Sequence, residues 1–301
     1  MKRVLALLGA VALVAGALAL RSALADDSAD VATEPGDEPG AVAAPVVACV
    51  PELETVCRGM ARIFELRVEE PADTVAAIDS GTEIDAWVTF DPWPEMAGIE
   101  SNHAFFSDPG LILASSPLVM LVRNGLLDGA CADDPNWACA VEARPGRAAV
   151  PSPDSAVGRL ALGWAAAEWN DVVRPGEPFA TAEFELPEFR NWLDDLATDE
   201  PDPLDEVLVL GPAGPFVLAT THADVSQRLA GSREDGRLAE FQTSRDASVA
   251  VVIVGPAAEF LASEPTLAAN FESAGWTPST EGSSGLPSPG LMFALAQEVS
   301  S

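Results

Sequence analysis

Tyrosine is absent from the sequence, lysine occurs once, at Lys2, and histidine occurs twice, at His103 and His222. Without tyrosine, any aromatic wall of a binding site has to come from tryptophan or phenylalanine. The 301 residues include 16 Lys and Arg residues against 47 Asp and Glu residues, a formal net charge of -31. A field of this sign repels phosphate backbones and anionic lipid head groups. We therefore expect no nucleic-acid partner.

The shortage of histidine also limits the chemistry that the chain can perform. A serine nucleophile needs a base within hydrogen-bond reach, and the G-x-S-x-G turn of many hydrolases does not occur in the sequence. Zinc sites need closely spaced cysteines or partner histidines. The acidic stretch at residues 199–206, which we interpret as a loop, lacks the spacing of a calcium-binding loop. We expect a protein that is not an enzyme and holds no metal or cofactor.

Four cysteines form two groups along the chain, Cys49 with Cys57 and Cys131 with Cys139. An even number of cysteines in an exported chain indicates disulfides, and four cysteines allow three pairings. The local pairing is the simplest, because each pair brackets a short turn-like segment. We predict the bridges Cys49–Cys57 and Cys131–Cys139, which act as structural staples.

The first 42 residues are expected to lie outside the folded part of the chain. A positive start precedes an uncharged apolar run over residues 4–20, and a small-x-small cleavage site ends at Ala25. This pattern is typical of a secretory signal. The run is slightly long for a signal and slightly short for a membrane span. We interpret residues 1–25 as a signal peptide, with an uncleaved membrane anchor as the alternative, and residues 26–42 as an acidic disordered linker. The protein is expected to be extracellular or at the cell surface.

Short apolar runs alternate with helical patterns over the next part of the chain. The runs at residues 43–50, 64–68 and 84–90 are typical of buried strands. Strands in alternation with helices predict an α/β fold with a parallel sheet, whose ligands bind beyond the carboxyl ends of the strands. This rule makes three residues candidates for ligand binding: Thr89, Asp91 and Trp93. The simpler interpretation is that the first two only end a strand and that the tryptophan packs.

A short apolar run at residues 148–150 leads directly into a predicted helix. Ser152 can cap this helix, Pro153 suits its first position, and Asp154 suits its first turn. Val157, Leu160, Ala161 and Trp164 share one face of the helix, which we expect to be buried. A strand that feeds a packed helix start can hold a ligand, especially an anion. Ser152, Asp154 and Ser155 are therefore candidates, and an ordinary capped helix is the alternative.

A long apolar run at residues 111–123 is interrupted by Ser115, Ser116 and Pro117. Two hydroxyls and a proline inside such a run predict a bulge or a crossing and not a plain central strand. Thr221 lies just after the end of a later short apolar run, at residues 216–219, and is also a candidate. The valine-rich run at residues 248–254 is the clearest late strand.

The order of several stretches resembles a known family. They are VVACVPELETVC, DAWVTFDPW, ASSPLVMLV, WACAVEARPGRAAVPSPDSAVGRLAL and SGLPSPGLMFAL. Together they resemble the type II extracellular, or periplasmic, solute-binding proteins. They are closest to the solute-binding-like domain that actinobacterial surface proteins place before a von Willebrand A domain.

The resemblance implies a fold of two lobes, each a mostly parallel sheet flanked by helices. Residues 43–122 and 239–301 would form lobe 1, residues 123–238 would form lobe 2, and the strand at 248–254 would pair within lobe 1. Ser115 and Ser116 would lie near the first crossing between the lobes. Residues 152–155 would face the cleft from lobe 2.

The resemblance also implies a function, the binding of a small solute between the lobes. A membrane transporter or a surface protein would be a possible partner. Oxyanion receptors of the family usually offer a small hydroxyl residue after the first strand, where this chain has Glu52. The full set of candidate ligand-binding residues is Glu52, Thr89, Asp91, Trp93, Ser115, Ser116, Ser152, Asp154, Ser155 and Thr221. Acidic candidates favour a cation and the helix start favours an anion, so the ligand charge stays open. The alternative function is a cell-surface interaction module that has the fold but binds no small molecule.

Overall fold

The computed structural model describes residues 44–60, 64–106, 108–127 and 129–300. The predicted signal peptide or anchor and the acidic linker lie outside the described residues. Within those ranges, no helix combines the length and the apolar character needed to span a membrane.

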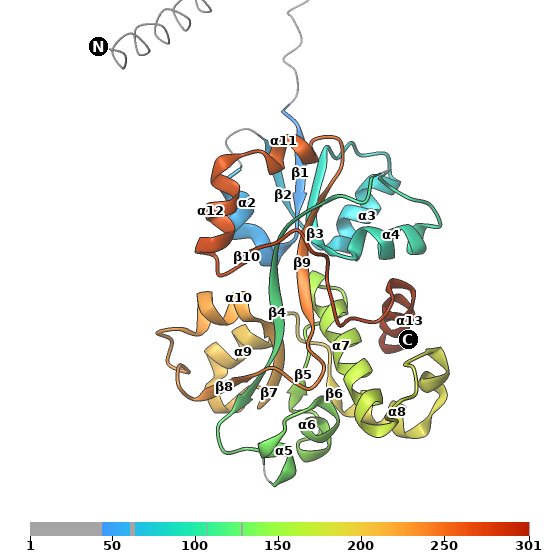
Figure 1. Ribbon diagram of the computed structural model, residues 1–301, viewed down its shortest axis with the longest axis vertical. Coiled ribbons are helices and arrows are strands. Elements are labelled where there is room, and N and C mark those ends of the chain that lie inside the picture. Colours follow the sequence, from blue (N-terminus) through green and yellow to red (C-terminus); the bar gives the residue numbers. More distant parts are fainter. Residues whose placement is uncertain (1–43, 61–63, 107, 128, 301) are drawn as a thin grey trace, which may run out of the picture. The chain divides into compact units, whose positions relative to one another are not determined.

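The first group of strands lies in the order β2-β1-β3-β9-β4 (Figure 1). Their bounds are Glu65–Val68, Val46–Cys49, Ala86–Asp91, Ser248–Val254 and Leu111–Arg123. The first three are parallel to one another, and β9 runs antiparallel between β3 and β4. The strands predicted from the apolar runs are thus confirmed. The late strand does pair with β3, as the predicted return of the chain to lobe 1 requires.

Strand β4 connects the two groups of strands. Over residues 111–117 it pairs with β9, and from Leu118 onward it pairs with β7 (Val217–Thr221). The second group adds β8 (Leu238–Phe241), β5 (Ala148–Ala149) and β6 (Leu196–Ala197). The predicted crossing therefore lies at Pro117, within one continuous strand of 13 residues. The fold is the expected α/β fold with helices around both groups of strands, while the exact lobe bounds stay a prediction.

Helices cover the faces of both groups of strands (Figure 1). On the first group lie α2 (Glu54–Arg58), α3 (Pro71–Asp79), α4 (Trp93–Ser101), α11 (Ala258–Ala262) and α12 (Pro265–Ser273). With the second group lie α5 (Ala130–Asp133), α6 (Trp137–Ala143), α8 (Pro187–Asp195), α9 (Pro203–Leu210) and α10 (His222–Asp224). The last helix, α13 (Pro289–Val299), packs against both α4 and α7 (Ala156–Val173).

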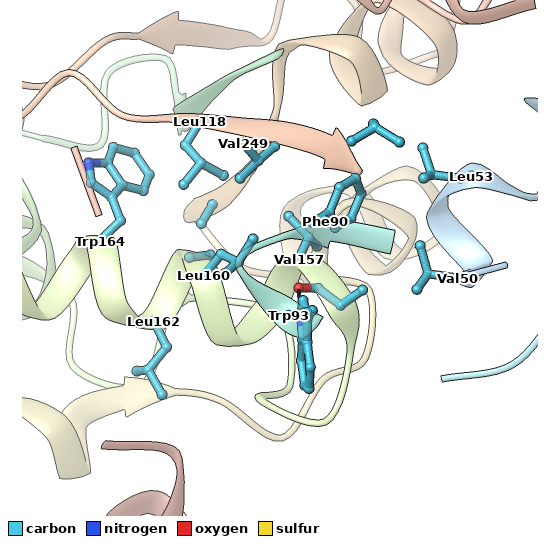
Figure 2. Close-up of a cluster of buried hydrophobic side chains, with 14 of the residues drawn as sticks. Val50, Leu53, Phe90, Trp93, Leu118, Val157, Leu160, Leu162, Trp164 and Val249 are labelled. Carbon is cyan, nitrogen blue, oxygen red and sulfur yellow. Dashed lines mark hydrogen bonds between the residues drawn. The ribbon is translucent and has the colours of Figure 1, made fainter. Parts of the chain in front are cut away.

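The long helix α7 is buried along most of its 18 residues. Side chains from both groups of strands gather around its first half, with Leu162 directed to the opposite side (Figure 2). The predicted apolar face, Val157, Leu160, Ala161 and Trp164, is buried as expected. Helix α7 contacts β3 of the first group and β7 of the second group. The start of α7 therefore lies where the two groups meet.

The prediction that Ser152 caps this helix is wrong. Ser155, and not Ser152, is the N-cap, because its Oγ accepts the Gly158 N–H at 3.1 Å. The Ser152 carbonyl instead accepts the N–H and the O–H of Ser155, which closes a turn before the helix. Pro153 and Asp154 consequently precede the helix and do not form its first turn. A serine-rich start offers more than one cap, and tertiary packing selects one.

The acidic stretch at 199–206 is also different from the loop that we expected. Asp202 caps α9 by accepting the Asp205 N–H at 3.0 Å, and Pro203 occupies the first helical position. An acidic cap followed by proline is a favourable helix start.

Both predicted disulfides are present. Cys49–Cys57 ties the end of β1 to α2, and Cys131–Cys139 ties α5 to α6. The first bridge encloses the short 3-10 helix η1 (Pro51–Leu53), which carries Glu52.

Candidate functional site

A pocket of about 290 Å³ lies where the two groups of strands meet. Its wall includes the turn after β1, the residue before α3, and the turn before α7. The start of α9, the end of β7, and α10 with the helical turn η4 (Val225–Leu229) complete it. Strand ends and helix starts thus converge on one pocket, which is the place where α/β sheets bind ligands.

Glu52 reaches across this pocket to α7. It follows β1 in η1, and its Oε1 accepts the Val157 N–H at 3.0 Å. Its other oxygen, Oε2, is buried and has no hydrogen-bond partner. The pKa of Glu52 is raised to about 7. Burial is the main cause, the hydrogen bond from the Val157 N–H opposes it, and the carboxylates of Glu70 and Asp224 add to the rise.

Other carboxylates share the pocket with Glu52. Glu70 precedes α3, and its Oε2 is likewise buried without a hydrogen-bond partner. Burial raises the pKa of Glu70 and that of Asp224. Two further acidic residues line the wall, Glu54 and Asp202. The potential inside the pocket is therefore negative.

Arg228 is the basic residue in the wall of this pocket. Its guanidinium lies 2.7 Å from the carboxylate of Asp202, 3.4 Å from that of Asp205 and 3.9 Å from that of Asp224. Acidic side chains of the protein itself therefore already surround this positive charge.

Of the predicted site residues, Glu52 and Ser155 line the pocket. Two others support it from outside, through hydrogen bonds to α10. Ser116 Oγ accepts the Ala223 N–H at 3.0 Å, and Thr221 Oγ1 accepts the Asp224 N–H at 3.1 Å. Ser155 and Ser116 therefore do not line one common pocket: Ser155 is part of the wall, and Ser116 holds α10 behind it.

The remaining predicted residues lie elsewhere. Thr89 is buried inside the sheet, and Ser115 of β4 pairs with Ala250 of β9. Trp93 is fully buried; its Nε1 donates to the Ala156 carbonyl at 2.7 Å, and its ring lies against the Arg159 guanidinium. Asp91 lines a separate surface pocket of about 680 Å³ beside α4. Ser152 and Asp154 form the turn before α7.

Sequence reasoning missed several residues of the pocket wall, namely Glu54, Glu70, Asp202, Thr220, Asp224, Gln227 and Arg228. A shared signal could have found two of them. Glu70 and Asp202 are each followed by proline at the first position of a helix. This acid-proline pattern marks a helix start, and helix starts surround the pocket.

One histidine lies beside a serine and a glutamate. His222 Nδ1 is 2.8 Å from Glu240 Oε1, and its Nε2 is 3.3 Å from Ser226 Oγ. These are the groups of a serine-hydrolase relay. None of the three residues lines either pocket described above. Ser226 lies within the helical turn η4.

No protein-family model and no curated protein matches the sequence. Solved structures do match the fold. The periplasmic thiamin binding protein has a TM-score of 0.57 at 10% identity, over 89% of this chain and 98% of that one. The ferric binding protein from Campylobacter jejuni has a TM-score of 0.56 at 9% identity, over 85% and 97%.

The sulfate-binding protein SubI from Mycobacterium tuberculosis H37Rv has a TM-score of 0.53 at 15% identity, over 78% of this chain and 87% of that one. The fold is that of the two-lobed periplasmic binding proteins. At these identities the likeness concerns the fold alone. The pocket between the two lobes must therefore be interpreted from this chain's own residues.

Proposed function

We propose that the protein is an exported solute-binding protein that holds a small ligand between its two lobes. The observation that carries this proposal is the pocket of about 290 Å³, whose wall contains residues from both groups of strands. A ligand that touches both lobes gains contacts in the closed arrangement that neither lobe offers alone. The similar structures bind small solutes according to their names, which supports the proposal.

Export is part of the same proposal. The signal-like amino terminus and the two disulfides support a location outside the cytoplasm. The resemblance to the actinobacterial surface domain supports a cell-surface location and a transporter or surface protein as partner. Catalysis is not proposed.

Thermal unfolding in the presence of small solutes tests the proposal. A ligand that binds only the folded state stabilises it by about 2.7 kcal/mol at a hundred times its Kd. For a domain of this size, we expect the melting temperature to rise by several degrees. The panel should contain cationic, neutral and anionic solutes. A folded protein whose melting temperature responds to none of them would contradict solute binding.

The alternative function is a surface interaction module with no small-molecule ligand. One contact favours it: the Glu52 side chain accepts the Val157 N–H and so joins the two lobes directly. A closed cleft of this kind could serve as a rigid surface. A flat response to the solute panel would support this alternative.

A further inference from the structure

The charged groups of the interlobe pocket are strongly unbalanced. Glu52, Glu54, Glu70, Asp202 and Asp224 line it, against Arg228. The Arg228 guanidinium is already paired with aspartates of the protein. An anionic solute would therefore meet several carboxylates and no uncommitted positive charge in this wall.

The start of α7 is the obvious place for an anion, but its second, third and fourth amides are occupied. The Val157 N–H is bound by Glu52 Oε1, and the Gly158 N–H is bound by Ser155 Oγ. The next amide, of Arg159, donates to the Ser155 carbonyl at 3.5 Å. The carboxylate of Glu52 thus stands where a bound anion would stand and satisfies the positive end of the helix.

Two acceptor atoms in the same pocket lack a donor. Oε2 of Glu52 and Oε2 of Glu70 are both buried without a hydrogen-bond partner. A buried carboxylate oxygen without a donor is unfavourable, since it has lost water and gained nothing in return. Burial accordingly raises the pKa of both carboxyl groups. A solute that carries N–H donors and a positive charge would remove this penalty.

The acidic side chains are spread along the wall and do not meet at one point. Among the residues that the structure describes, no group of three or more His, Cys, Asp or Glu side chains is placed to hold a metal ion. A spread of acceptors suits an organic cation whose donors are separated by carbon atoms.

We propose that the pocket selects a small organic cation with N–H donors, an alkylammonium or amidinium compound, and that Glu52 excludes anions from it. Glu52 and Glu70 accept hydrogen bonds from the cation, and Glu52 also keeps the start of α7 occupied. This inference rests on the proposed function and specifies the ligand class of the same site.

The experiment compares the full chain with E52Q, E70Q and E185Q at pH 8, by thermal unfolding and calorimetric titration. Glu185 provides the control, because it lies outside the pocket wall, is exposed, and is paired with Arg190 at 2.6 Å. The probes are putrescine and agmatine as N–H cations, choline as a cation without N–H donors, glucose, sulfate, phosphate and Ca²⁺.

We expect putrescine or agmatine to stabilise the wild type more than choline does. E52Q and E70Q should each weaken the binding about tenfold or more, because a hydrogen bond to a charged group is lost. E185Q should change it less than about threefold, as is usual for an exposed charge outside the site. Sulfate should stabilise E52Q more than the wild type. Circular dichroism checks that each variant is folded, and E70Q alone tests the acceptor pair if E52Q does not fold.

The outcomes separate the two proposals. Stabilisation of the wild type only by glucose, sulfate, phosphate or Ca²⁺ would overturn the cation inference and leave solute binding intact. Equal binding of the cation by the wild type and both Gln variants would overturn the roles of Glu52 and Glu70. A wild type that responds to no probe would overturn the cation inference, and the wider solute panel would then decide on solute binding itself.

Discussion

Glu52 Oε1 accepts a hydrogen bond from the backbone N–H of Val157, at 3.0 Å, across the meeting point of the two lobes. Glu52 follows the first strand of one lobe, and Val157 lies in the first turn of α7. A hydrogen bond to an ionised acceptor at a helix start is among the stronger single contacts in proteins. This contact therefore couples the protonation of one side chain to the contact between the lobes.

The first prediction concerns pH. The folded-state pKa of Glu52, about 7, lies above its ordinary value of 4.5. The folded protein therefore binds a proton that the unfolded chain releases, and stability should fall as pH rises from about 4.5 to about 7 and then level off. Relative to E52Q, the wild type should lose up to about 3 kcal/mol of stability between pH 5 and pH 8. The partial solvent exposure of the Glu52 residue lowers this figure.

Urea unfolding of both proteins at several pH values measures this difference. Subtracting the E52Q curve removes most of the contribution of the other carboxyl groups. Parallel curves for the two proteins across this pH range would contradict the raised pKa.

The second prediction concerns the cap of α7. Ser155→Ala should cost about 1 kcal/mol, because the Gly158 N–H loses its acceptor. Ser152→Ala is the matched control, since the Ser152 Oγ accepts only a longer bond of 3.4 Å from the Asp154 N–H. We expect the control to change the free energy of unfolding by less than about 0.5 kcal/mol. If Ser152→Ala lowered the free energy of unfolding as much as Ser155→Ala, or more, Ser155 would not be the cap.

The third prediction concerns two glycines of the same helix. A Cβ at Gly158 would collide with the Ser152 carbonyl and lie 2.6 Å from the Pro151 carbonyl. A Cβ at Gly163 would instead meet the flexible side chain of Met292, at 2.7 Å. Gly158→Ala should therefore cost roughly 3 kcal/mol or more, because backbone has to move.

Gly163→Ala should cost less than Gly158→Ala, because Met292 can turn aside and alanine favours the helix by about 1 kcal/mol. Chemical unfolding of both variants gives the comparison. A Gly158→Ala protein as stable as Gly163→Ala would show that the turn before α7 is not packed as described.

The fourth prediction concerns a buried ion pair of the second lobe. Arg123 Nη1 lies 2.7 Å from Glu234 Oε2, and both residues are buried. Glu234→Ala should cost about 3–5 kcal/mol, because it leaves the guanidinium buried without its partner. Glu185→Ala is the control, since that glutamate pairs with Arg190 at the surface and should matter little.

The pH dependence of this pair has the opposite sign to that of Glu52. The hydrogen bond from Arg123 lowers the pKa of Glu234. The ion pair therefore stabilises the fold fully above about pH 4.5, and this stabilisation should be lost as the pH falls further. Unfolding measured from pH 5 down to pH 3 should show a steeper loss in the wild type than in the Glu234→Ala protein.

Local patterns in the sequence were sufficient for much of the fold. Short apolar runs predicted β1, β3 and β9, because a strand buried on both faces is mostly apolar. The spacing of the cysteines predicted both disulfides, since each bridge closes a short local loop. Ser115, Ser116 and Pro117 marked the crossing within β4, where polar groups and a proline interrupt an otherwise apolar strand.

The binding pocket depended on the tertiary structure. Glu52, Glu70, Asp202 and Asp224 are far apart in the sequence, and only the packing of two lobes around α7 gathers them. The choice of Ser155 over Ser152 as cap also depended on how the turn at residues 151–155 fits against the helix. The sequence determined most of the strands and helices, because burial and capping act over a few residues. The structure decided which carboxylates share one low-dielectric pocket, because charge interactions depend on distance in space and not on distance along the chain.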